Sequence, residues 1–182
     1  MIRLFIALLI PNEIRIQLIN HCKKIVPDYY SYNWEKQNKI HLTLKFIGDF
    51  KEELLSQLME EIDFIQRIKS FNCEINELGF FYKNNEPKIL WANLKTEDRI
   101  IKVVEELNSK LEKFDVKTDN RKFKAHLTLL RIKKHPGELF IEAINKSKLE
   151  QLKFNSDKIA LIKSTLAKQG SIYKELKVFE LK

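Results

Sequence analysis

Hydrophobic positions along the chain follow two spacings, continuous runs typical of buried strands and recurrences at helical intervals. The run over 3–10 is apolar after its arginine and stops at Pro11, which predicts a central strand covered on both faces. Apolar residues then recur at helical spacing between Asn12, a candidate N-cap, and Pro27, which ends the pattern. The other elements predicted in the first half are a strand over 40–47, a helix with a capping-box pattern at Asp49 and Glu52, and a strand over 71–75.

The second half of the chain repeats this order. The elements predicted there are a strand over 89–94, a helix over 100–111, a strand over 126–132, a helix from Glu138, and final strands over 158–165 and 172–181. Matching positions lie 85 residues apart in the first strands (90 − 5), the helix starts (97 − 12) and the second helices (138 − 53). The repeat predicts one bilobed domain over 1–182, with pseudo-two-fold halves at roughly 1–85 and 86–182 whose central strands face one cleft. The length of 182 residues fits a single domain.

Two identical tetrapeptides, His41-Leu42-Thr43-Leu44 and His126-Leu127-Thr128-Leu129, lie in the matching strands, again 85 residues apart (126 − 41). At ordinary residue frequencies these three residues follow a given histidine about once in 2,000 cases, so chance is a poor explanation. Because side chains alternate along a strand, each histidine shares a face with its threonine, while the leucines and Phe46 face the core. If the strands meet across a cleft, two imidazoles and two hydroxyls converge on one phosphate-sized ligand.

Such a cluster suits phosphodiester chemistry, which needs a base, an acid and donors for the non-bridging oxygens. Histidine titrates near pH 6.5, so one imidazole can be neutral while the other is protonated. Nearby cations that can complete the site are Arg131, Lys45 and Arg3. The other histidines, His21 and His135, lack the tetrapeptide and are interpreted as surface or structural residues. No metal site and no cofactor are expected, because two histidines without a Cys, Asp or Glu at short spacing are too few ligands.

The charge balance and the cysteines indicate which partner and which cellular compartment to expect. Lysine and arginine number 33 against 25 acidic residues, a net charge of +8, which favours a polyanionic partner, although a lysine-rich composition can explain the excess alone. Cys22 and Cys73 form no CxxC pair, which fits a reduced, cytoplasmic protein. The apolar run at the N-terminus is too short for a spanning helix and lacks a cleavage site, so no membrane association is expected.

The paired motifs resemble those of the two-histidine (2H) phosphoesterase superfamily. Within it, the chain most resembles the RNA 2′,3′-cyclic phosphodiesterases first called 2′-5′ RNA ligases, over nearly its whole length. The matching segments are Arg3-Leu4-Phe5-Ile6-Ala7, Trp34, Phe46-Ile47-Gly48, Leu90-Trp91-Ala92, Arg121-x-Phe123, Arg131 and Tyr173. The chain departs from the family pattern at Ala125, where a proline commonly precedes the second histidine, and in a glycine-rich stretch that is reduced to Gly170.

The resemblance implies an α+β fold with two antiparallel sheets flanking a central cleft and helices outside. It also implies hydrolysis of ribose 2′,3′-cyclic phosphates to 2′-phosphomonoesters. His41 would protonate the leaving 3′-oxygen, His126 would activate water, and Thr43 and Thr128 would hold the phosphate.

The resemblance also assigns roles to four further residues. Arg131 corresponds to a phosphate-side arginine, but strict alternation from His126 places it on the opposite face, so a bulge or the strand end must re-aim it. Phe5, Trp34 and Tyr173 can stack a terminal base, or they can pack in the core.

The two motifs are compatible with several alternative functions. A basic RNA-end-binding module can use the same side chains without turnover, and the same chemistry can act on a small cyclic-phosphate nucleotide. The reverse reaction would join RNA ends through a 2′-5′ linkage. The expected partners are RNA or tRNA fragments with 2′,3′-cyclic phosphate ends, and the protein is expected to be a monomer. A pseudo-symmetric motif does not decide which histidine is the acid and which the base.

Overall fold

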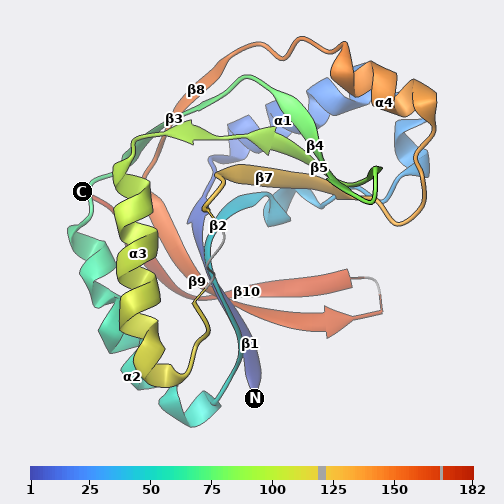
Figure 1. Ribbon diagram of the computed structural model, residues 1–182. Coiled ribbons are helices and arrows are strands. Elements are labelled where there is room, and N and C mark those ends of the chain that lie inside the picture. Colours follow the sequence, from blue (N-terminus) through green and yellow to red (C-terminus); the bar gives the residue numbers. More distant parts are fainter. Residues whose placement is uncertain (119–121, 169) are drawn as a thin grey trace.

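The computed structural model describes residues 1–118, 122–168 and 170–182, and Figure 1 shows helices outside two layers of strands. The helices are α1 (Asn12–Ile25), α2 (Leu55–Glu61), α3 (Arg99–Leu111) and α4 (Glu138–Asn145), with 3₁₀ turns at Tyr29–Ser31, Gln37–Lys39, Glu52–Leu54, Ile62–Arg67 and Glu112–Phe114. The strands are β1 (Ile2–Leu9), β2 (His41–Phe50), β3 (Phe71–Ile75), β4 (Leu78–Lys83), β5 (Glu86–Asn93), β6 (Lys95–Thr96), β7 (His126–Arg131), β8 (Leu152–Ser156), β9 (Lys158–Ala167) and β10 (Gly170–Glu180). Arg121, which belongs to the family resemblance, lies outside the described residues.

All pairings within the two strand layers are antiparallel. The first layer is a four-stranded sheet in the order β10-β9-β1-β2. The second consists of two three-stranded sheets, β4-β5-β7 and β6-β3-β8, which continue each other because β4 directly follows β3 and β6 directly follows β5. The Asn93 side chain closes the break, since its Oδ1 accepts hydrogen bonds from the backbone N–H groups of Asn76 and Glu77 at 3.0 Å. The predicted α+β fold class is confirmed.

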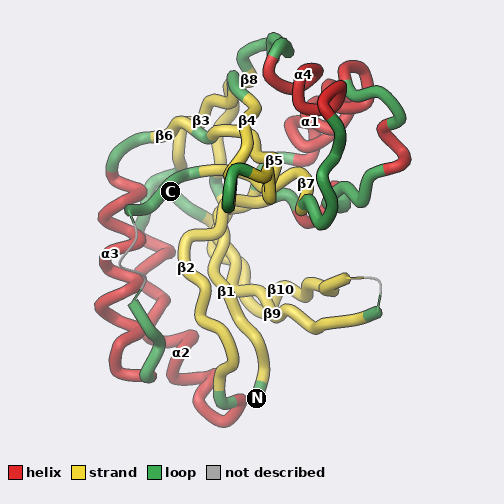
Figure 2. The backbone as a smooth tube through the Cα atoms, turned by 45° about the vertical axis from the view of Figure 1, so that its right-hand side comes forward, coloured by secondary structure: helices red, strands yellow, loops and turns green. Residues whose placement is uncertain are grey.

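The two halves of the sequence exchange elements. In Figures 1 and 2, α2 and α3 lie together along β2 of the first layer, whereas α1 and α4 lie beside the second. Contacts of α3 with β2 and of α4 with β4 agree with this arrangement. β9 and β10, from the second half, complete the sheet of β1. Each lobe therefore contains segments from both of the predicted halves, 1–85 and 86–182.

Strand β1 is buried on both faces, as its continuous hydrophobic run predicts. Its residues Leu4, Ile6 and Leu8 are fully buried in the main core between the sheets and the helices. On the opposite face Phe5 and Ala7 belong to a second, smaller cluster. Both faces of this strand thus contribute packing energy, and the second cluster supports the site described below.

Two predicted helix caps are wrong. Asn12 lies inside α1, whose N-cap residue is Pro11, and its Oδ1 instead accepts hydrogen bonds from Gln37 Nε2 at 2.6 Å and Arg15 Nη2 at 3.4 Å. Asp49 lies inside β2 and pairs with Arg3 at 3.3 Å, because the strand continues to the buried Phe50 before the chain turns. Strands β4, β6 and β8 were not predicted, because short hydrophobic patterns of this kind do not distinguish strands from loops.

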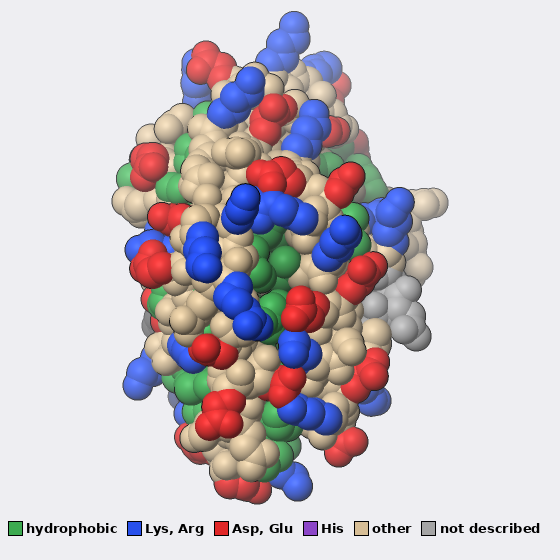
Figure 3. Space-filling view, turned by 90° about the vertical axis from the view of Figure 1, so that its left-hand side faces the viewer, with side chains coloured by type: hydrophobic (Ala, Val, Ile, Leu, Met, Phe, Trp, Pro, Cys, Tyr) green, Lys and Arg blue, Asp and Glu red, His purple; other side chains and the backbone are tan. Residues whose placement is uncertain are grey.

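The outer surface over α2 and α3 carries both signs of charge. Figure 3 shows basic and acidic side chains interspersed on this face, and Glu61 there pairs with both Lys110 and Lys113. The positive excess of the chain is therefore not concentrated on this side. In the described part of the chain, no helix combines the length and the apolar character needed to cross a membrane.

Candidate active site

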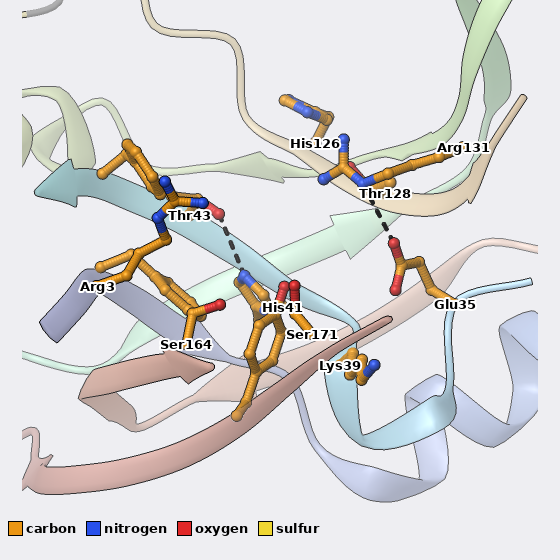
Figure 4. A pocket seen from close by; sticks show the side chains of 13 residues that line it. Arg3, Glu35, Lys39, His41, Thr43, His126, Thr128, Arg131, Ser164 and Ser171 are labelled. Atoms are coloured by element: carbon orange, nitrogen blue, oxygen red, sulfur yellow. Dashed lines mark hydrogen bonds and ion pairs between the residues drawn. The ribbon is translucent and has the colours of Figure 1, made fainter. Parts of the chain in front are cut away.

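The two His-Leu-Thr-Leu segments meet at one cavity of about 260 Å³ between the strand layers. β2 contributes His41 and Thr43 to its lining, and β7 contributes His126, Thr128 and Arg131. Figure 4 shows these side chains directed into a shared space from the two strands. The structure therefore brings together both histidines, both threonines and the arginine that the sequence singled out.

Matching β-bulges in β2 and β7 determine which side chains reach the cavity. In β2, Ile6 pairs with Lys45 and Ala7 with Thr43, so Leu44 has no partner on β1. In β7, Leu90 pairs with Leu130 and Trp91 with Thr128, which leaves Leu129 as the extra residue. The two extra leucines occupy the same position of the repeat, since 129 − 44 is again 85. An extra residue reverses the alternation of faces beyond it.

The bulges explain the positions of three residues downstream of the motifs. Arg131 lines the cavity, as the family resemblance implies, although strict alternation from His126 would turn it away. Phe46, at the equivalent position in β2, also lines the cavity and is 57% exposed, so its predicted core position is wrong. Lys45 is turned into the protein, where its Nζ donates to Asn108 Oδ1 at 2.6 Å and to the Lys117 carbonyl at 2.8 Å. Lys45 therefore does not supply charge to the cavity.

The imidazole of His41 is tightly held. Its Nε2 lies 3.1 Å from Thr43 Oγ1, and its ring stacks on Phe5 with centroids 4.9 Å apart. The ring edge of Tyr173 approaches it with a centroid separation of 5.7 Å. Burial lowers the pKa of His41 to about 4, against the opposing effect of a backbone hydrogen bond at Lys39. In the free protein at neutral pH, His41 is therefore uncharged.

The imidazole of His126 is oriented by the backbone. Its Nδ1 lies 2.7 Å from the carbonyl oxygen of Lys124, two residues earlier, so the Nδ1–H donates there and Nε2 is left as the lone-pair nitrogen. Besides its contact with Thr43, His41 forms a hydrogen bond with the backbone of Lys39, also two residues earlier. The ring edge of Phe81 packs against His126 at a centroid distance of 4.9 Å. The two histidines are thus fixed by equivalent local geometry in the two strands.

The cavity is positively charged. Arg3, Lys39 and Arg131 line it with one acidic residue, Glu35, which gives 3 − 1 = +2 with both histidines neutral. Glu35 forms an ion pair with Arg131 at 3.3 Å, and its backbone N–H donates to the Leu129 carbonyl at 2.8 Å. The segment that precedes β2 is therefore anchored to β7 and holds the arginine side chain at the cavity. An anion of phosphate size fits this lining in both charge and hydrogen-bond donors.

The aromatic residues proposed for base stacking have different environments. Phe5 lines the cavity, but it is 4% exposed and its ring stacks on His41, so it supports the imidazole and leaves little ring surface for a base. Trp34 does not line the cavity: its ring stacks on Tyr29 with centroids 4.6 Å apart, and its Nε1 donates to the Tyr29 carbonyl at 2.8 Å. These two stacking predictions are not supported by the geometry. Tyr173 does line the cavity.

The remaining histidines lie elsewhere. His21, in α1, has a pKa that burial lowers, and His135 Nδ1 accepts the Gly137 backbone N–H at 3.2 Å.

Sequence reasoning missed Glu35, Lys39, Ser164 and Ser171 in the cavity lining. Glu35 lies in irregular chain and Lys39 in the short 3₁₀ turn before β2, where no periodicity indicates the direction of a side chain. Within residues 1–118, 122–168 and 170–182, no three His, Cys, Asp or Glu side chains are grouped so that they could hold a metal ion.

Fold and site together define a two-histidine phosphoesterase: two equivalent strands place a His–Thr pair each at one cationic cavity. The family model described as LigT like Phosphoesterase matches residues 8–91 and 94–173, and the chain belongs to this family.

Relatives and solved structures are similar to this chain over almost its full length. The RNA 2′,3′-cyclic phosphodiesterase of Thermotoga maritima is 29% identical over 179 residues, covering 96% of this chain and 92% of the relative. That of Aquifex aeolicus is 30% identical over 193 residues, covering 99% and 97%. The crystal structure of E. coli LigT complexed with 3′-AMP superposes with a TM-score of 0.82 at 24% identity, covering 99% of this chain and 98% of that one. The last comparison establishes a shared fold.

Proposed function

We propose that this protein hydrolyses RNA 2′,3′-cyclic phosphate ends to 2′-phosphomonoesters by acid–base catalysis with two histidines. The observation that carries the proposal is the convergence of two His–Thr pairs and Arg131 on one cavity with a charge of +2 (3 − 1). Family membership supports the reaction class. The names of the relatives from Thermotoga maritima and Aquifex aeolicus support RNA ends as the substrate.

The proposed reaction uses each motif for one half of the displacement. Thr43, Thr128 and Arg131 donate hydrogen bonds to the non-bridging oxygens of the cyclic phosphate. His126 Nε2, free because Nδ1 donates to Lys124, takes a proton from water as the water oxygen bonds to phosphorus. The P–O3′ bond breaks, and the 3′-oxygen keeps the electron pair and takes a proton from His41 Nε2. The product is a 2′-phosphomonoester with a free 3′-hydroxyl.

The low pKa of His41 bears on whether His41 can act as the general acid. With a pKa of about 4, His41 carries no proton to donate in the free protein at neutral pH. The anionic phosphate must therefore raise that pKa when it binds near the imidazole. If it did not, His41 would be the base and His126 the acid, which the pseudo-symmetric geometry permits equally.

The proposal treats residues 1–182 as one catalytic domain that acts as a monomer in the cytoplasm, without a cofactor, on RNA or tRNA fragments. Ligation through a 2′-5′ linkage is the reverse direction of the same chemistry. Sheets that mix segments from both halves of the chain support a single unit, since β1 pairs with β9 and β3 with β8.

Phosphorus NMR of nucleoside 2′,3′-cyclic monophosphates incubated with the protein tests the proposal directly. The cyclic resonance should be replaced by that of a 2′-monophosphate, in the presence of EDTA as well. His41→Ala and His126→Ala should each lower kcat/KM by about 10²-fold or more. His135→Ala is the matched control, because His135 lies outside the cavity, and it should keep full activity. An unchanged cyclic resonance would indicate a binding module, and full activity in His126→Ala would exclude the two-histidine mechanism.

A further inference from the structure

Among the described residues, Glu35 is the one acidic side chain in the cavity lining, and the proposed reaction does not use it. Its carboxylate lies 3.3 Å from Arg131 Nε, and Figure 4 shows it pointing at the guanidinium from the segment that precedes β2. Because this ion pair is made at Nε, the terminal Nη1 and Nη2 groups of the arginine can donate to a phosphate. Glu35 and a bound phosphate can therefore act on the same guanidinium at the same time.

The fold holds the Glu35 carboxylate in place. The backbone N–H of Glu35 donates at 2.8 Å to the carbonyl of Leu129, the extra residue of the β7 bulge. The preceding residue, Trp34, forms an isolated β-bridge with Leu130. The Glu35 side chain is 21% exposed, against 62% for Arg131. Its negative charge is therefore a fixed part of the cavity that a ligand meets.

The Tyr173 hydroxyl shows that this charge acts across the cavity. Burial raises the pKa of Tyr173 most, the carboxylate of Glu35 raises it further, and Arg131 opposes the change. Tyr173 lines the cavity from β10, in the strand layer that lies opposite β7. The field of Glu35 thus extends through the space that a substrate would fill.

The substrate and the product of the proposed reaction differ in charge. A 2′,3′-cyclic phosphate is a diester with a single negative charge. A 2′-phosphomonoester carries a charge of about −1.5 to −2 at neutral pH, because the new P–OH group has a pKa of about 6 and loses its proton. Cations that attract the substrate therefore attract the product more strongly. Arg3, Lys39 and Arg131 alone would give the lining a charge of +3, and Glu35 lowers it to +2 (3 − 1).

We infer that Glu35 is a specificity-determining residue that favours the monoanionic cyclic diester over the dianionic monoester and thereby promotes product release. The inference rests on the proposed function, which supplies the two ligands. A carboxylate roughly 7 Å from the phosphate, in a cavity open to solvent, weakens the binding of one additional negative charge about three- to tenfold. Arg131 holds the phosphate during the reaction, while Glu35 limits how tightly the product stays bound.

Isothermal titration calorimetry at pH 8 with two matched ligands tests this role. 3′-Deoxyadenosine 2′-monophosphate is the dianion and its phosphate methyl ester the monoanion, and neither has a 3′-hydroxyl with which to cyclise. Glu35→Gln keeps the shape of the side chain and removes its charge, so both ligands should bind more tightly. The ratio of their dissociation constants should shift about three- to tenfold in favour of the dianion.

Two further variants separate the charge from other effects of substitution. Glu35→Asp keeps the charge and should shift the ratio by less than about twofold. Glu142→Gln is the matched control, because it removes a carboxylate that pairs with Lys146 at 3.1 Å on α4. Glu142 lines neither the cavity of the two motifs nor the adjoining cavity of about 690 Å³, so this variant should bind both ligands as wild type does.

The direction of the change distinguishes discrimination by charge from simple positioning of Arg131. Weaker binding of both ligands in Glu35→Gln would show that Glu35 only positions the arginine, and an equal change for both would show that its charge does not discriminate. Either result overturns the inference, as does a monophosphate that binds neither wild type nor Glu35→Gln. If wild type hydrolyses no cyclic phosphate, the proposed function fails, while the calorimetric ratio still decides the role of Glu35.

Discussion

Binding of a phosphate monoester should raise the pKa of His41 from about 4 to about 7. Burial depresses this pKa from its usual 6.5, a difference that corresponds to about 3.4 kcal/mol (2.5 × 1.36). A single negative charge about 4 Å from the imidazole, at an effective dielectric constant of about 20, stabilises the imidazolium by about 4 kcal/mol, or about 3 in pKa. The attraction is thus large enough to offset the burial, and His41 becomes able to donate a proton only when substrate is present.

Imidazole ¹⁵N and ¹³C NMR titrations of the free protein and of its complex with adenosine 2′-monophosphate measure this change. The resonances are assigned with His41→Asn and His126→Asn. His135 lines neither cavity and provides the internal control, whose imidazole chemical shifts should not change when the nucleotide binds at fixed pH. If His41 in the saturated complex still titrates below about pH 5, the acid assignment is wrong, and His41 would have to act as the base.

Three further predictions follow from single contacts. Arg131→Ala should lower kcat/KM about 10-fold or more, because it removes a charged hydrogen bond to the phosphate. Arg131→Lys should recover part of the lost activity, since it keeps the charge but not the guanidinium geometry. Equal activity in wild type and both variants would show that Arg131 does not contact the substrate. Gly79→Ala should destabilise the fold by about 1–3 kcal/mol in urea unfolding, because the new Cβ would lie 2.5 Å from Trp91 Cζ2, and the additional change Trp91→Leu should relieve the loss. The unfolded chain binds more protons at His41 than the folded protein between pH 6.5 and 4, so stability should be full above pH 6.5 and decrease toward pH 4 by up to about 3 kcal/mol. His41→Gln should reduce this slope, and an identical slope in that variant would contradict the burial argument.

The sequence specified the elements whose hydrophobic patterns are long. The strands β1, β2, β7, β9 and β10 and the helices α1 and α3 appear close to their predicted bounds. A continuous apolar run or a helical stripe of this length has few alternative ways to bury its side chains. The short strands β4, β6 and β8 were missed, because their stability comes from pairing partners elsewhere in the chain.

The sequence alone also identified the paired motifs. In any strand, residues two apart point to the same face, so each His-Leu-Thr-Leu segment presents its histidine and threonine together whatever the strand pairs with. Only the tertiary structure decided which neighbours join them. The bulges at Leu44 and Leu129 bring Arg131 to the cavity and turn Lys45 away, and they depend on how β1 and β5 pair with these strands. Pairing register is a non-local property, as are the position of Glu35 beside Arg131 and the low pKa that burial gives His41. The paired motif residues could therefore be identified from the sequence, whereas their charge state and their neighbours in the cavity depend on contacts between distant segments.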